Sequence, residues 1–175
     1  WYSKYSAMTP EELAVHRAAP KHLQVAPSFR STQSAHRLPR PFRKSMRGPR
    51  MHTTGEITLS AEHCAFFFWR DGELLTDAAF FAWLMFKGPN QTLYPLLEYH
   101  YHPSHKGLHI KLPCNTTTDD TGRMLPNAPE LNLNLPPQVD PRQLEGRQIL
   151  IHRFCEICGI RVGQGNDLWL SLIHI

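Results

Sequence analysis

The sequence predicts an α+β domain, in which a small antiparallel sheet surrounds one buried aromatic helix and a disordered basic segment precedes both. Three observations predict it: apolar and polar residues alternate in short stretches, an unbroken apolar block covers residues 78–86, and the first 50 residues are rich in Pro and Arg. The composition suits one globular domain, because 41% of the 175 residues are hydrophobic and 19% are charged. The apolar block is too short to cross a membrane, which needs roughly 20 residues.

Positive charge is concentrated at the beginning of the chain. Residues 1–50 contain ten Lys/Arg and two Asp/Glu, a net charge of +8, whereas residues 51–175 have a net charge of −4. Between Pro20 and Arg50, prolines are frequent and apolar residues are sparse, which predicts disorder. A flexible basic segment attracts phosphate groups, so residues 1–50 suggest nucleic acid as a partner.

These changes in charge and composition along the chain predict the domain boundaries. Residues 1–50 are the basic Pro-rich segment, which is disordered, or is not translated if the protein begins at Met51 rather than at Met8 or upstream. Residues 51–169 are the globular domain, which we expect to be incomplete at its C-terminal end. Residues 170–175 read like a translated sequencing adaptor and are left out of the fold.

The elements are predicted in order along the chain. The capping-box pattern Thr9-Pro10-Glu11-Glu12 predicts a short helix that ends near Ala19. Residues 56–60 and 64–69 have the composition of strands. Asp71-Gly72 lies between apolar runs and predicts a hairpin that continues into Leu74-Leu75.

The apolar block predicts the buried helix. Asp77 can cap it, the aromatic residues continue to Phe86, and Gly88-Pro89 end it. Because the block is apolar around its whole circumference, we expect it to be core rather than a ligand site. Residues 115–147 are rich in turn residues and contain one alternating strand at residues 131–135, and residues 148–154 are a helix end or a strand.

Residues 96–114 contain four of the eleven histidines: His100, His102, His105 and His109. Period-two alternation on both arms predicts a hairpin, and matching the apolar faces pairs Tyr101 with Leu108 and His100 with His109. His100, His102 and His109 then share one polar face, close enough to bind one metal ion. An open three-histidine site could activate water for a metal-dependent hydrolase, with Glu98 or Asp119/Asp120 as the base and His105 as an alternative ligand. The alternative is a hairpin whose polar, histidine-rich face is simply solvated.

The C-x-x-C pair Cys155/Cys158 suggests a second metal site. Gly159 suits a zinc knuckle, and the residues after it form a poor helix, which favours zinc over redox chemistry. The best second pair within the sequence is His109 and Cys114, giving a Cys3His zinc site of His109, Cys114, Cys155 and Cys158. Alternatively the second pair follows Trp169, and His109 then belongs to the histidine cluster. Cys64 is expected to be a buried core thiol.

Two partial resemblances concern His100-Tyr-His102. It resembles the His-hydrophobe-His motif of rolling-circle endonucleases, but no tyrosine follows Tyr101 to act as nucleophile. With Pro103 it is similar to the His-x-His-Pro of zinc-dependent isopeptidases, whose Ser-x-x-Asp partner is matched only by the distant Thr116-x-x-Asp119. The zinc-deaminase and phosphate-loop patterns are missing from the sequence. Neither motif is complete, and the sequence assigns the chain to no family.

These observations lead to three functional hypotheses. The first is a zinc-binding module with a structural Cys/His site that associates with nucleic acid. The second is a metal-dependent hydrolase, nuclease or isopeptidase-like, that uses the histidine cluster, and the third is a protein-interaction domain with a purely structural zinc ion. No secretory signal or membrane-spanning segment is evident in the sequence, which favours the cytoplasm and no membrane partner.

Overall fold

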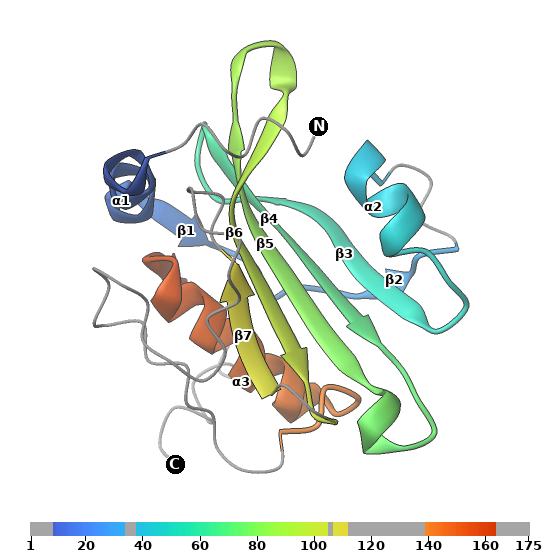
Figure 1. Ribbon diagram of the computed structural model, residues 1–175. Helices are drawn as coiled ribbons and strands as arrows, with labels where there is room; N and C mark the ends of the chain where they lie inside the picture. The colour runs from blue at the N-terminus through green and yellow to red at the C-terminus, as the bar shows by residue number, and fades with distance from the viewer. Residues whose placement is uncertain (1–8, 34–37, 105–106, 112–138, 164–175) are drawn as a thin grey trace.

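One antiparallel sheet of six strands organises the protein. The structure is a computed structural model that describes residues 9–33, 38–104, 107–111 and 139–163. The strand order β2-β3-β4-β5-β6-β7 follows the chain, so each strand pairs with its neighbours in sequence (Figure 1). The bounds are β2 Arg30–Ser31, β3 Met51–Thr58, β4 His63–Arg70, β5 Ala79–Lys87, β6 Leu93–His102 and β7 Gly107–Lys111. This confirms an α+β fold built on an antiparallel sheet.

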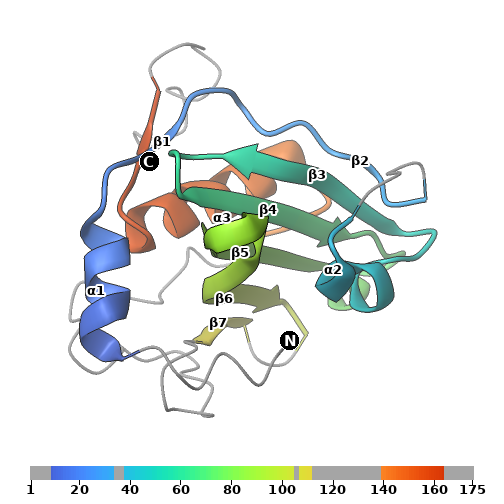
Figure 2. The same ribbon diagram turned by 90° about the horizontal axis from the view of Figure 1, so that it is seen from above.

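Helices lie against both faces of this sheet. α3 (Leu144–Ile157) packs in the core on one face and α2 (Arg40–Ser45) in the core on the other, and Figure 1 shows α2 beside β3. In Figure 2, α1 (Pro10–Ala18) lies at the opposite end of the sheet from α2. A second, parallel sheet joins β1 (Lys21–Leu23) to β8 (Ile160–Val162), which brings the beginning of the described chain beside its end.

The predicted aromatic helix is wrong, because the apolar block forms strand β5. This strand pairs with β4 on one side and β6 on the other, and its residues 79–85 are all buried. A strand covered on both faces is apolar at every position, so it has no alternation by which it can be told from a buried helix. Asp77 ends a short 3-10 turn, Leu75–Asp77, rather than capping an α-helix.

The two faces of the sheet form two cores. One contains Phe67, Phe80 and Tyr99 with Phe154 of α3. The other contains Phe66, Phe68 and Trp83, and the ring of Phe42 from α2 lies 4.8–5.1 Å from each of these three rings. Alternate residues of β4 and β5 therefore enter opposite cores.

The structure does not confirm the disorder expected across residues 20–50 in the part of this segment that it describes. β1 pairs with β8, β2 pairs with β3, and α2 packs on the sheet. The segment contributes few apolar side chains, but Leu23, Leu38, Phe42 and Met46 are all buried. The average composition of the segment does not predict this burial, because each of these side chains fills a separate place in the core. The β2–β3 pairing also crosses the boundary expected at residue 51.

Other predictions of local structure are confirmed or adjusted. The helix beginning after Thr9 has both hydrogen bonds of the capping box, and Ala19 is its C-cap. The chain reverses after Asp71-Gly72, but the second arm of that hairpin begins at Ala79 rather than at Leu74. Residues 148–154 belong to α3. The strand expected at residues 131–135 lies outside the described residues.

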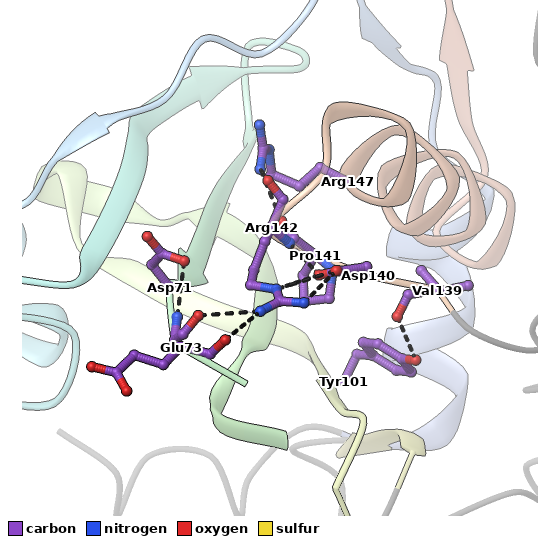
Figure 3. Close-up of polar contacts among 9 residues, drawn as sticks. Asp71, Glu73, Tyr101, Val139, Asp140, Pro141, Arg142 and Arg147 are labelled. Carbon is purple, nitrogen blue, oxygen red and sulfur yellow. Dashed lines mark hydrogen bonds and ion pairs between the residues drawn. The ribbon is translucent and has the colours of Figure 1, made fainter. Parts of the chain in front are cut away.

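A set of polar contacts ties the start of α3 to the sheet (Figure 3). The Arg142 guanidinium bonds the Asp140 carboxylate at 2.8 Å and donates to the Gly72 and Glu73 carbonyls of the β4–β5 loop. Tyr101 Oη donates to the Val139 carbonyl at 2.9 Å. Arg142 lowers the pKa of Asp140, so the carboxylate stays ionised and the contact persists at neutral pH.

Candidate metal centre

The β6–β7 hairpin has the register predicted from the sequence. His100 pairs with His109, Tyr101 with Leu108 and His102 with Gly107. Gly107 has a φ of 61°, a left-handed conformation that favours glycine, at the first position of β7. Tyr101 and Leu108 enter the core beneath α3, and the three histidines therefore lie on the opposite face of the sheet.

The three histidines form one compact cluster. One ring nitrogen from each of His100, His102 and His109 can be chosen so that all three atoms lie within 4.8 Å of one another. The His109 ring centroid is 5.2 Å from that of His100 and 5.4 Å from that of His102. Two nitrogens bound to one tetrahedral zinc ion lie about 3.3 Å apart, given Zn–N bonds of about 2.0–2.1 Å. Small side-chain rotations would therefore bring all three nitrogens onto one ion.

Aromatic residues and one carboxylate surround the cluster. Phe81 lies edge-on to His100 and His102, with ring centroids 5.3 and 5.4 Å apart, and Trp83 lies 5.5 Å from His100. Both residues belong to β5. Because the sequence predicts a helix at this position, it does not place Phe81 and Trp83 beside the histidines. Continuing the strand alternation from the histidine hairpin into the apolar block is the sequence signal that could have identified them.

Glu98 is the acidic group beside the cluster. Its Oε2 lies 3.5 Å from His100 Nε2, and both side chains are 14% exposed. His100 Nε2 is buried and makes no hydrogen bond to any described residue, and a 3.5 Å contact is too long to count as one. His109 is buried more deeply, at 3% exposure. Among the residues that the structure describes, the donor set is therefore three imidazoles with one carboxylate close by, which suits zinc and neighbouring transition metals.

The structure does not bring His109 to the cysteine pair. Cys155 lies in the last turn of α3 and Cys158 is its C-cap, both within the core that α3 forms with the sheet. His109 lies on the other side of that sheet, beside His100 and His102. A metal ion cannot touch His109 and these thiols together in this arrangement.

The cysteines have the environment of core thiols. Cys155 is 1% exposed and Cys158 is 0% exposed, and burial raises the pKa of Cys155 to about 12 and that of Cys158 still further. Burial also raises the pKa of Cys64 on β4 to about 12, in agreement with the core thiol expected there. Instead of the expected knuckle, a helix contains Cys155 and ends just before Cys158, and the chain turns at Gly159, whose φ is 63°.

Some predicted site residues lie outside the described part of the chain. These are His105, Cys114, Asp119 and Asp120. A zinc site that joins Cys155 and Cys158 to residues in that part stays a prediction, as does a role for His105 or the two aspartates.

Comparison with known proteins adds no relative. No protein-family model, curated protein or solved structure matches this chain. Among the described residues, no helix combines the length and apolar character needed to cross a membrane. Functional inference therefore rests on the residues of this chain.

Proposed function

We propose that the protein binds one divalent transition-metal ion, zinc in the first place, through His100, His102 and His109. The observation that supports this is the convergence of three ring nitrogens within 4.8 Å on one face of a hairpin. A histidine-rich face that was merely solvated would be exposed, whereas His109 is only 3% exposed and lies beside two other imidazoles.

Rigid elements position the three ligands. His100 and His102 lie on β6, which is paired on both sides, and His109 lies opposite His100 on β7, which pairs with β6. The opposite faces of both strands are fixed by Tyr99, Tyr101 and Leu108 in the core. Ligands on packed strands keep their relative positions, which lowers the ordering cost of binding an ion.

Three protein ligands leave room for a fourth from solvent or substrate. This is the ligand number of catalytic zinc sites, where the ion makes water more acidic and polarises a bound carbonyl or phosphoryl oxygen. Glu98 is the described carboxylate placed to accept a proton there, 3.5 Å from His100. If the bound ion is catalytic, the protein is a metal-dependent hydrolase. If it is not, the ion has a structural role.

Metal content and folding of the full chain test the proposal. We expect one zinc or cobalt ion per wild-type chain, retention of the ion in Cys155→Ser/Cys158→Ser, and its loss in His100→Ala/His102→Ala with the circular dichroism spectrum unchanged. His22→Ala is the matched control, because His22 is exposed on β1. Metal that is lost from the cysteine variant and retained by the histidine variant would contradict the proposal.

A second proposal concerns nucleic acid, because cations are concentrated at α2. Arg43, Lys44, Arg47 and Arg50 are all exposed, and residues 38–50 contain no acidic residue. Such a surface attracts phosphate groups without reading sequence. Phosphate attraction, which the sequence predicts for a flexible basic segment, would then come from α2 and the residues that follow it.

Binding of a labelled single-stranded oligonucleotide at two salt concentrations tests this second proposal. We expect Arg47→Ser to weaken binding and to lower the salt dependence by about one released ion. Arg161→Ser, an exposed arginine on β8, removes the same charge elsewhere and should have little effect. Equal effects of the two variants would contradict a specific surface at α2.

A further inference from the structure

A histidine pair lies at the other end of the sheet, where α1 meets it. His16 Nδ1 on α1 is 3.0 Å from His63 Nε2 at the start of β4. The ring of His16 also packs against Phe86 of β5, with centroids 4.5 Å apart. The two histidines are 47 residues apart in sequence, so no local pattern could have paired them.

The hydrogen bond requires a neutral ring. One nitrogen must donate and the other must accept, so at least one of the two imidazoles has no charge. On its other side, His63 Nδ1 lies 2.9 Å from Ser60 Oγ in the β3–β4 turn, and a hydroxyl can rotate to donate or accept. If both rings were protonated, two N–H groups and two positive charges would face each other.

The charged groups around the pair favour the neutral form of His63. Lys21 Nζ is buried nearby and donates to the carbonyls of His16, Arg17 and Ala19 at the end of α1. Burial, then Lys21 and then His16 lower the pKa of His63 to about 4. Burial also lowers the pKa of His16, with Lys21 acting in the same direction and Glu62 and Glu12 opposing it.

Few of the described side chains of α1 are buried. Leu13 is the buried side chain of this helix among those described, whereas Val15 is 69% exposed. The contacts that hold the helix include Leu13 in the core, the ring contacts of His16 and the carbonyls bound by Lys21. The Arg17 carbonyl also lies close to Gly159, beyond the end of α3.

We propose that His16 and His63 form a pH-sensitive latch, which keeps α1 docked on the sheet at neutral pH and releases it in mild acid. Release places both imidazoles in water, where each can take up a proton. The docked form binds fewer protons than the released form, so acidification favours release. The effect begins as the pH falls through 6.5, the ordinary pKa of histidine, and is complete near the lowered pKa of His63 at about 4.

Hydrogen exchange of the full chain at pH 7 and pH 5, corrected for intrinsic rates, tests the latch. From the lowered pKa of His63 alone, we expect the protection of α1 amides to fall about 20-fold between these pH values, while α3 amides keep their protection. His63→Gln keeps a side-chain amide near the position of Nε2 but cannot be protonated, and it should remove most of this fall. His22→Gln, which changes an exposed histidine on β1, should leave it intact.

Three outcomes would overturn the latch. They are α1 protection that is equal at both pH values, loss of α1 and α3 protection together, and a His63→Gln variant with the full pH effect. If His63→Gln does not fold, the protonation state of His63 in the wild-type protein can be measured instead, from the nuclear magnetic resonance shifts of its ring nitrogens. A neutral ring in the docked state at pH 5 supports the latch, and a protonated docked ring contradicts it.

Discussion

His100 and His109 face each other across the β6–β7 ladder, with their ring centroids 5.2 Å apart. His102, two residues further along β6, completes the cluster by stacking on His109 at 5.4 Å. Because the opposite faces of both strands enter the core, the hairpin cannot shift by one residue without burying the imidazoles under α3. The packing of the sheet therefore maintains the proposed ligand geometry.

Glu98 should tune the metal affinity through its position beside His100. A carboxylate that accepts the free ring N–H of a ligating histidine orients the ring, and its loss typically weakens metal binding by about 10-fold or more. Glu98 Oε2 would accept from His100 Nε2 once metal binding through Nδ1 shortens their 3.5 Å separation. We expect Glu98→Gln to have this effect in a calorimetric zinc titration. Glu145→Gln, an exposed glutamate on α3, is the control and should bind zinc as the wild type does. Unchanged affinity in Glu98→Gln would exclude this role.

Phe42 should contribute substantially to stability, although it lies in the segment that the sequence predicts to be disordered. Its ring is 2% exposed and contacts Phe66, Phe68 and Trp83. Truncation of such a residue costs about 3–5 kcal/mol, so we expect Phe42→Ala to lower the free energy of unfolding by that amount in urea. Lys44→Ala, an exposed neighbour, should change it by less than about 0.5 kcal/mol. Equal stability of the two variants would show that α2 is not docked.

Tyr99 and Tyr101 should respond in opposite ways to loss of the hydroxyl group. Tyr99 Oη is buried and makes no hydrogen bond to the described residues, whereas Tyr101 Oη donates to Val139. We expect Tyr99→Phe to be neutral or to stabilise the protein by about 1 kcal/mol, and Tyr101→Phe to destabilise it by about 1 kcal/mol. Thermal unfolding of the two variants provides the measurement. A larger loss in Tyr99→Phe would reveal a partner for its hydroxyl.

Alkylation of the cysteines should separate core thiols from metal ligands. Burial raises the pKa of Cys155 to about 12, so almost no thiolate is present at pH 8, and labelling by iodoacetamide should become faster only as the pH rises or the core opens. We expect Cys155 and Cys158 to react at least about 100-fold more slowly than in the denatured chain. Addition of EDTA should not change this rate. Faster labelling after chelation would indicate that a metal ion had protected the thiols.

The sequence determined the histidine hairpin well because its two arms have opposite polar and apolar faces. A slip of one residue would place Tyr101 and Leu108 on opposite sides of the sheet, and the structure has the register in which they pair. The same reasoning failed for β5, since a strand that is buried on both faces has no polar positions to mark its period. Composition failed for Leu23 and Phe42, because single apolar residues in a basic segment can each fill a place in the core.

Contacts between distant segments could not be predicted at all. The sheet separates His109 from Cys155 and Cys158. This separation depends on which face of the sheet α3 packs against, and the sequence does not show that. The His16–His63 pair depends on where α1 docks, and the capping box that correctly predicts this helix carries no information about its docking site. Local rules thus identified the candidate ligands, and the tertiary fold decided which of them meet.

X-ray absorption at the zinc edge of the zinc-loaded full chain tests the central proposal most directly. Zinc bound by the three histidines should show only nitrogen or oxygen neighbours at about 2.0–2.1 Å, with the outer-shell scattering of imidazole rings. Sulfur neighbours at about 2.3 Å would place the ion at the cysteines and contradict the three-histidine site.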